Sequence, residues 1–245
     1  MPFQTLNLEK GKPMIKTCAI VLAAGKGKRM NASTPKQYMN LKDKPVLYYS
    51  VSAFQSSYVD EIVIVCGEGD EDYVRNEIVD KYSFNKVKRI VTGGKERYHS
   101  VFEGLKACND TDFVLIHDGA RPFINEEILN RVYESVLKDE ACVAAVPVTD
   151  TIKVVDDDNF VKSTPDRKTL WSMQTPQAFK YDLVYEAYSK LIDNEETVLA
   201  EGINITDDAM VVEHFTKHPV RIVMGDYTNI KITNPMDIKI GETYL

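Results

Sequence analysis

The chain has 245 residues, of which 44% are hydrophobic and 27% charged, and its formal net charge is −7. This composition is typical of a globular protein, and the length suffices for one large domain with a substantial core. The negative charge argues against a general nucleic-acid binder, and the longest apolar runs have the length of strands, too short to cross a membrane. A polyanionic ligand must therefore be held by a local cluster of cations and backbone N–H groups.

The first 13 residues are polar and carry two lysines without an apolar stretch behind them. They lack the pattern of a secretory signal, so we expect residues 1–13 to form a flexible extension and residues 14–245 to form a single domain. Four cysteines without Cys-x-x-Cys spacing predict buried, reduced thiols in a cytoplasmic protein, with neither a metal site nor a disulfide framework. They are Cys18, Cys66, Cys108 and Cys142.

Short runs rich in Val and Ile alternate with helical stretches along most of the chain. The strand-like runs are 17–22, 61–66, 87–91, 113–116 and 142–147, and the helical stretches are 46–56, 71–82, 100–108 and 126–137. Continuous apolar runs suit strands that are covered on both faces. Repeated strand–helix units predict an α/β fold with a mostly parallel, doubly wound sheet.

The alternation stops after residue 147. Residues 150–155 and 160–163 flank an Asp-rich turn and predict a β-hairpin that is polar on both sides. We expect this protruding arm, about residues 148–166, to reach a partner. The alternation then resumes, with helices predicted at 183–191, 207–213 and after Pro235, and strands at 220–223 and 230–233.

The first strand runs into Leu-Ala-Ala-Gly-Lys-Gly-Lys-Arg-Met at residues 22–30. Small residues after a first strand allow close approach to a ligand, and their N–H groups can hold phosphate. The loop has no Walker spacing, and Met30 stands where a dinucleotide-binding loop has its third glycine. Its three cations favour a triphosphate. Lys36, in the following Pro-Lys-Gln, is either a further phosphate-binding cation or a solvated surface lysine.

Two further motifs follow the third and fourth strands. Residues 93–100 read Gly-Gly-Lys-Glu-Arg-Tyr-His-Ser, where paired glycines permit contact with a flat base edge and Ser100 either assists or caps the next helix. His-Asp-Gly-Ala-Arg-Pro at 117–122 ends the fourth strand, at the edge where open α/β sheets bind ligands. Asp118 is a candidate Mg²⁺ ligand, or else forms a salt bridge with Arg121 that shapes a turn.

These segments, in this order, resemble the 2-C-methyl-D-erythritol 4-phosphate cytidylyltransferase family from residue 15 to 245. The resemblance rests on the glycine-rich loop and on Pro-Lys-Gln, Gly-Gly-x-x-Arg, His-Asp-x-Ala-Arg-Pro, Asp-Thr-Ile-Lys, Thr-Pro-Gln and Asn-Ile-Lys. It implies a Rossmann-like fold, CTP as co-substrate, a Mg²⁺ cofactor, a homodimer formed through the β-arm, and a role in isoprenoid precursor synthesis.

The resemblance also implies a role for each matching residue. CTP would be surrounded by Ala23, Ala24, Gly25 and Gly27, its phosphates neutralised by Arg29 and Lys36, and its cytosine contacted by Gly94 and Ser100. The sugar-alcohol phosphate would face Thr175, Thr206 and Lys231, with Asp118 serving the metal and the substrate hydroxyls. The partner subunit would supply Thr151, Arg121 and Arg167. Catalysis would depend on Arg29, Lys36, Lys231 and Asp118.

Two alternatives are open. Ribitol 5-phosphate cytidylyltransferases share the chemistry, but they tend to have Gly-Gly in the loop and Thr-Asp-Ala near Thr206, where this chain has Ala23-Ala24 and Thr-Asp-Asp-Ala. The second alternative is a non-catalytic nucleotide-binding protein of the same fold. The intact set of Arg29, Lys36 and Asp118 argues against it.

Overall fold

The computed structural model describes residues 15–25, 34–108 and 110–245. The expected extension at 1–13 and the loop residues Gly27 and Arg29 lie outside this part of the chain. Within it, a seven-stranded sheet has the order β11-β7-β10-β6-β1-β4-β5. Its strands are β1 (Thr17–Ala23), β4 (Glu61–Cys66), β5 (Val87–Thr92), β6 (Phe113–Asp118), β7 (Ala141–Pro147), β10 (Trp171–Lys180) and β11 (Arg221–Met224).

The sheet is mostly parallel, as the sequence predicts. Strand β1 pairs in parallel with β4 on one side and with β6 on the other. Strand β4 also pairs in parallel with β5, and β7 pairs in parallel with β11. Only β10 runs antiparallel to its neighbours β6 and β7 among the described strands of this sheet. In the register of β1 and β6, Leu22 lies opposite Asp118. Ala24 and Gly25, which follow β1, and Asp118 at the end of β6 therefore lie at the same edge of the sheet.

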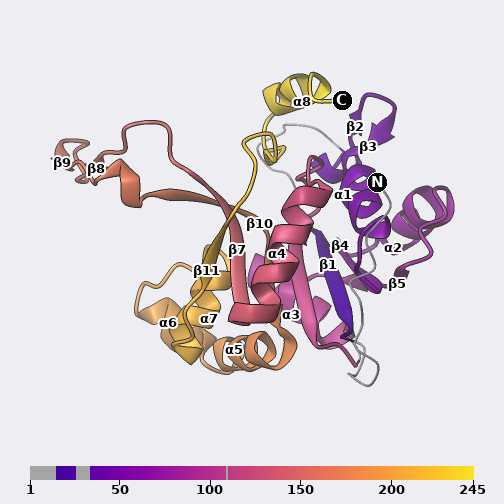
Figure 1. Cartoon of the computed structure of the whole chain (residues 1–245), viewed down its shortest axis with the longest axis horizontal. Coiled ribbons are helices and arrows are strands. Elements are labelled where there is room, and N and C mark those ends of the chain that lie inside the picture. The colour runs from indigo at the N-terminus through magenta and orange to yellow at the C-terminus, as the bar shows by residue number, and fades with distance from the viewer. Residues whose placement is uncertain (1–14, 26–33, 109) are drawn as a thin grey trace.

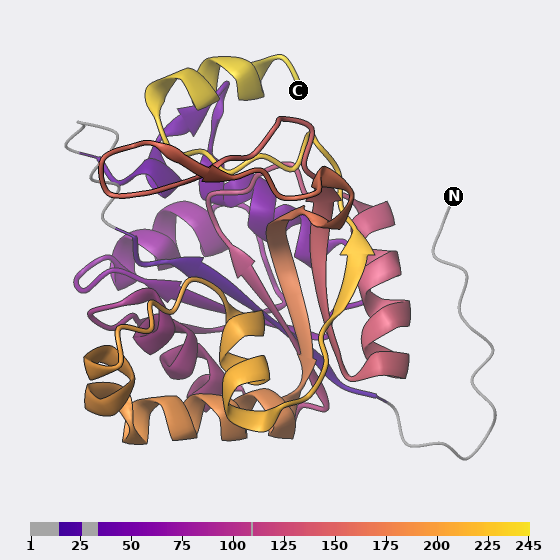
Figure 2. The ribbon, with the colours of Figure 1, turned by 90° about the vertical axis from the view of Figure 1, so that its left-hand side faces the viewer.

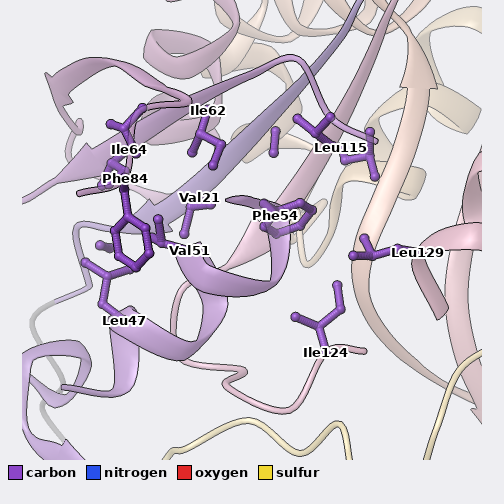
Figure 3. Packing of buried hydrophobic residues seen from close by; sticks show 14 of the residues in the cluster. Val21, Leu47, Val51, Phe54, Ile62, Ile64, Phe84, Leu115, Ile124 and Leu129 are labelled. Atoms are coloured by element: carbon purple, nitrogen blue, oxygen red, sulfur yellow. The ribbon is translucent and has the colours of Figure 1, made fainter. Parts of the chain in front are cut away.

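Helices cover both faces of the sheet, and alternate residues of β1 enter two separate cores. Ala19 and Val21 pack with Phe54 of α1 (Val46–Gln55) and with α4 (Glu126–Asp139), as Figure 3 shows for Val21 and Phe54. Cys18 and Ile20 pack on the other face, against α3 (Arg97–Ala107), α5 (Tyr181–Asp193) and α7 (Asp208–Thr216). This two-sided burial explains why the sequence of β1 is continuously apolar.

Several elements differ from the sequence-based expectations. The stretch 71–82 divides into α2 (Glu71–Tyr73) and a π-helical segment (Val74–Asp80), and α6 (Glu195–Ala200) was not expected. Thr-Pro-Gln at 175–177 lies inside β10, a strand that the sequence pattern did not predict, and the register of β10 with β7 shifts between Met173 and Gln177. The strand expected at 230–233 is wrong. That segment is joined to the rest of the protein by individual hydrogen bonds and not by strand pairing; Ile232 N, for example, donates to Ala120 O at 2.8 Å.

The hairpin arm is present, as β8 (Val154–Val155) paired antiparallel with β9 (Val161–Ser163). It projects from the body in Figure 1 and points toward the viewer in Figure 2. The expectation that it is polar on both sides is wrong, because Phe160 is 72% exposed and three valines are nearly half exposed or more. The arm therefore presents apolar surface that its own chain leaves uncovered.

The remaining elements lie near the sheet edge that carries the loops. They are the 3₁₀ turn Lys36–Tyr38, β2 (Asn40–Leu41), β3 (Lys44–Pro45), the 3₁₀ turn Arg167–Thr169 and α8 (Pro235–Glu242). In the described part of the chain, no helix has both the length and the apolar character needed to cross a membrane.

Candidate active site

A cleft of about 600 Å³ opens at the carboxyl ends of β1 and β6. It brings together residues that the sequence places in five separate motifs. Its lining comprises Leu22, Ala24, Gly25, Lys36, Gln37, Gly94, Lys95, Glu96, Arg97, Ser100, Asp118, Ala120 and Lys231. The sheet edge predicted to bind a ligand is thus the edge where the motifs meet.

Lys36 reaches the cleft because the residue after it is anchored to the first strand. The buried Gln37 side chain donates to the carbonyl oxygen of Ala23 at 2.5 Å and ties the 3₁₀ turn to the end of β1. The Lys36 ammonium then donates to the carbonyl oxygen of Ile232 at 2.8 Å. Lys36 is therefore held at the cleft by two segments distant in sequence, which does not fit the alternative of a solvated surface lysine.

The loop from Gly93 to Ser100 is closed by the Ser100 hydroxyl. Ser100 Oγ accepts a hydrogen bond from Gly94 N at 3.1 Å and donates to Glu96 O at 3.3 Å. Ser100 does not cap α3, because Glu96 is the N-cap and exchanges bonds with His99. A Cβ at position 94 would lie 2.3 Å from His99 Cβ, so packing of the loop against the helix requires glycine there.

Asp118 is the centre of charge in the cleft. Its Oδ2 lies 2.7 Å from Lys231 Nζ and 3.8 Å from Arg121 Nε, and its Oδ1 lies 3.5 Å from Arg97 Nε. Burial raises the pKa of Asp118, but the charges of these three cations outweigh it and hold the pKa well below its usual range. The carboxylate is therefore ionised at physiological pH.

The arrangement around Asp118 fits a metal ligand poorly. Three cations within 4 Å compete with a divalent ion for the carboxylate oxygens. Among the described residues, no group of three or more His, Cys, Asp or Glu side chains is arranged to hold a metal ion. The three neighbouring cations therefore do not favour Asp118 as the ligand of a divalent ion.

Behind Asp118 lies a buried hydrogen-bond chain. Asp118 N donates to Thr175 Oγ1 at 3.1 Å, and Thr175 Oγ1 lies 3.1 Å from His117 Nδ1. His117 Nε2 lies 3.1 Å from the carbonyl oxygen of Arg121 and must donate to it, so Nδ1 accepts the Thr175 proton. Thr175, expected to face the substrate, is only 4% exposed, and its hydroxyl donates a hydrogen bond to His117. It fixes the backbone of Asp118 instead.

The residues expected from a partner subunit divide into two groups. Arg121 lies beside Asp118 of its own chain, and its Nη1 donates to Asn229 O at 2.7 Å, which favours a role in its own chain. Thr151 and Arg167 lie exposed at the base of the arm, outside the cleft, and Arg167 Nη1 donates to Thr149 O at 2.7 Å.

Thr206 also lies outside the cleft, exposed just before α7, and the N-cap of that helix is Asp207. Arg97 and Asp208 each stand within a motif of the sequence, but the motifs alone do not predict a role for either residue. The structure joins them: Arg97 Nη1 and Nη2 donate to the two oxygens of Asp208 at 2.6 and 2.8 Å. The arginine of Gly-Gly-x-x-Arg and the second aspartate of Thr-Asp-Asp-Ala were the available signals.

A doubly wound sheet whose cleft joins a glycine-rich loop to lysines and an ionised carboxylate is typical of a nucleotidyltransferase. The family model of 2-C-methyl-D-erythritol 4-phosphate cytidylyltransferase matches residues 17–245. The chain belongs to this family.

Individual relatives agree with the family match. The cytidylyltransferase of that name from Lachnoclostridium phytofermentans is 49% identical over 95% of this chain and 97% of its own, and that from Lachnospira eligens is 50% identical over 93% and 98%. The crystal structure of 4-diphosphocytidyl-2C-methyl-D-erythritol synthase from Anaerococcus prevotii superposes with a TM-score of 0.79 at 35% identity, covering 94% of this chain and 96% of that one.

Proposed function

We propose that the cleft at the ends of β1 and β6 transfers CMP from CTP to 2-C-methyl-D-erythritol 4-phosphate and releases pyrophosphate. Membership of the cytidylyltransferase family supports this activity and its place in isoprenoid precursor synthesis. The structural observation that carries the assignment of the site is the convergence of Lys36, Lys231 and Asp118 beside the glycine-rich loop.

The reaction needs no protein nucleophile. A 4-phosphate oxygen of the substrate forms a bond to the α-phosphorus of CTP, while the bond from that phosphorus to the bridging oxygen breaks and pyrophosphate leaves. A phosphate monoester is already largely ionised near pH 7, so no general base is required. Catalysis then consists of holding the two phosphates in line and stabilising the charge that develops between them.

Lys36 and Lys231 supply that stabilisation from the described part of the chain, and Arg29 is proposed to add to it. Ala23 at the end of β1, together with Ala24, Gly25 and Gly27 after it in the sequence, is proposed to surround the CTP phosphates. Gly94 and Ser100 are proposed to contact the cytosine, because the exposed backbone of a glycine can approach the edge of a base. The bond from Gly94 N to Ser100 Oγ keeps that backbone in one conformation.

Asp118 is proposed to accept hydrogen bonds from the hydroxyls of the sugar alcohol, since an ionised carboxylate is an acceptor only. Arg121, beside Asp118, is proposed to act in its own chain. Thr206, although it lies outside the cleft lining, is proposed to contact the substrate. Mg²⁺ is proposed to enter as a complex with the CTP phosphates, whose charge it would neutralise.

A homodimer formed through the arm is proposed as the working state. Its support is the exposed apolar surface of Val154, Val155 and Phe160, which a partner could cover. Arg167 and Thr151 at the base of the arm are then proposed to enter the partner's site. Four buried free cysteines support a reducing compartment such as the cytoplasm.

The experiment is a pyrophosphate-release assay with 2-C-methyl-D-erythritol 4-phosphate and each of CTP, UTP, ATP and GTP. We expect kcat/KM for CTP to exceed that for the other nucleotides by at least about a hundredfold, because a site that hydrogen-bonds a base rejects one lacking the matching groups. Gly94→Ala is assayed beside the wild type, because its added methyl group crowds the proposed base site. Equal use of a purine nucleotide would contradict the assignment of the cytosine site.

A further inference from the structure

The guanidinium of Arg97 is shared between two carboxylates. Arg97 is the first residue of α3 and lines the cleft. Its Nη1 and Nη2 form a bidentate pair with Asp208, while its Nε faces Asp118 Oδ1 at 3.5 Å. A bidentate pair fixes the plane of the guanidinium as well as its position. The direction in which Nε points is therefore set by Asp208.

Asp208 is itself held rigidly. Its side chain is fully buried, and it accepts a third hydrogen bond from the hydroxyl of Tyr188 at 2.5 Å. Its backbone N–H donates to Gln177 Oε1 at 3.0 Å, which fastens the start of α7 to β10. Through Arg97 and Tyr188, Asp208 thus joins α7 to both α3 and α5.

The two oxygens of Asp118 face different cations, with Lys231 and Arg121 beside Oδ2 and Arg97 beside Oδ1. Oδ2 contacts Lys231 at 2.7 Å, and Oδ1 faces Arg97 only through its single Nε–H. If Asp208 no longer held the other two nitrogens, Arg97 would be a partly buried cation with Asp118 as the anion beside it. A bidentate pair of Arg97 with Asp118 would then occupy the oxygens that face the cleft.

We infer that Arg97 and Asp208 form a positioning pair that restrains Arg97 and so keeps the Asp118 carboxylate open to the hydroxyls of the sugar-alcohol phosphate. This inference rests on the proposed function, because it deepens the role given there to Asp118. Neither Asp208 nor Tyr188 lines the cleft, so both act through Arg97.

The first test is Asp208→Asn, which keeps the shape of the side chain and removes its charge. We expect kcat/KM for the sugar-alcohol phosphate to fall by at least about tenfold, since small displacements of a substrate-orienting group are costly. KM for CTP should stay within about threefold, because the pair does not hold the base-binding loop through Gly94 or Ser100.

Glu195→Gln is the matched control. Glu195 also fastens the first turn of α3, by accepting from Tyr98 at 2.6 Å and pairing with His99 at 3.2 Å, but it makes no contact with Arg97 or Asp118 among the described contacts. It should leave kcat/KM for the sugar-alcohol phosphate within about twofold of wild type if the effect of Asp208→Asn arises through Asp118 and not from loosening of the helix.

The part played by the guanidinium is tested with the triple variant Arg97→Met, Asp208→Leu, Tyr188→Phe. Apolar replacement of a buried ion pair often preserves stability, so this variant should keep the wild-type melting temperature. Because no guanidinium remains to occupy Asp118, the inference predicts that its kcat/KM for the sugar-alcohol phosphate lies at least about threefold above that of Asp208→Asn. A stable triple variant as impaired as Asp208→Asn would overturn the inference, as would Asp208→Asn with unchanged kinetics.

Failure of the proposed function would be seen separately, as a folded wild-type protein that releases no pyrophosphate from CTP and 2-C-methyl-D-erythritol 4-phosphate. In that case crystal structures of wild type and Asp208→Asn decide the inference. A carboxylate of Asp118 turned into a bidentate pair with Arg97 supports it. An unmoved Asp118 and Arg97 in the variant overturns it.

Discussion

The ammonium of Lys36 donates a hydrogen bond of 2.8 Å to the carbonyl oxygen of Ile232 beside the cleft. Because Ile232 follows Lys231 directly, this bond holds the two proposed phosphate-binding lysines against the same edge of the site. Lys231 in turn pairs with Asp118 at 2.7 Å. The positions of the cations are thus fixed by contacts within the protein, as electrostatic stabilisation of a transition state requires.

Replacement of Lys36 should therefore affect catalysis more than folding. We expect Lys36→Ala to lower kcat by roughly a hundredfold or more, as for the loss of one preorganised donor, with little change in melting temperature. Lys88→Ala is the control, because Lys88 also donates to a backbone carbonyl, that of Asn85, but lies exposed on β5. Turnover of a folded Lys36→Ala protein within a few-fold of wild type would remove Lys36 from the mechanism.

Substitution of Gly94 should weaken nucleotide binding. A Cβ at this position would lie 2.3 Å from His99 Cβ, so Gly94→Ala must shift the loop from α3. We expect KM for CTP to rise by roughly tenfold, with a smaller change in kcat, as for the loss of binding shared by ground and transition states. Gly225→Ala is a steric control, because its Cβ would meet only Gln174 and Ala145, away from the cleft lining. Equal effects of both variants on KM would contradict the cytosine assignment.

The buried His117 should make stability depend on pH. Burial lowers the pKa of His117 to about 4 from the ordinary histidine value of 6.5, so between these values the unfolded chain binds the proton more readily. The free energy of unfolding should therefore fall as pH decreases through this window, by as much as about 3 kcal/mol from this residue. Urea unfolding between about pH 7 and pH 5 measures the slope. His117→Asn, less stable at neutral pH, should have the flatter profile, and identical slopes would exclude this origin.

Disruption of the arm should separate the subunits. Phe160 is 72% exposed at its tip, and we expect Phe160→Asp to shift the protein from dimer to monomer in sedimentation velocity, because a charge cannot be buried there without a partner. Leu199→Asp alters an apolar residue that is 55% exposed on α6, outside the arm, and should remain dimeric. A monomeric wild type, or a dimeric Phe160→Asp, would contradict the proposed interface.

The same interface predicts complementation between two inactive variants. If each site combines Lys36 of one chain with Arg167 of the other, then Lys36→Ala and Arg167→Ala homodimers should both be nearly inactive. Random exchange between equal amounts should restore about a quarter of the wild-type sites, because half the dimers are mixed and each of these has one intact site. Verified exchange without recovery of pyrophosphate release would place both residues in the site of one chain.

The central architecture was predictable because it depends on burial. Strands such as β1 and β4 are covered on both faces, so their apolar runs were visible in the sequence. Strand β10 was not recognised because Pro176 and polar residues interrupt its pattern, although Gln174 and Gln177 are buried by pairing with distant segments. The apolar surface of the arm was not predicted, because it depends on the hairpin having no core of its own in which its valines and Phe160 could be buried.

The site shows the same limit. Asp118, Lys36 and Lys231 were predictable from motifs, since each stands in a short, specific segment. The pairing of Arg97 with Asp208 and the burial of Thr175 were not, because they depend on which side of β10 and α7 faces the cleft. Sequence motifs identify residues that lie near the reacting groups. Which of these residues contact the substrate, and which hold other residues in place, depends on tertiary packing.

Choice of the acceptor substrate tests the account most directly. The measurement is kcat/KM for pyrophosphate release from CTP, with 2-C-methyl-D-erythritol 4-phosphate and with ribitol 5-phosphate as competing acceptors. We predict a preference of at least about tenfold for the methylerythritol phosphate, a difference near 1.4 kcal/mol in transition-state binding. Equal rates with the two acceptors, or a preference for ribitol 5-phosphate, would contradict it.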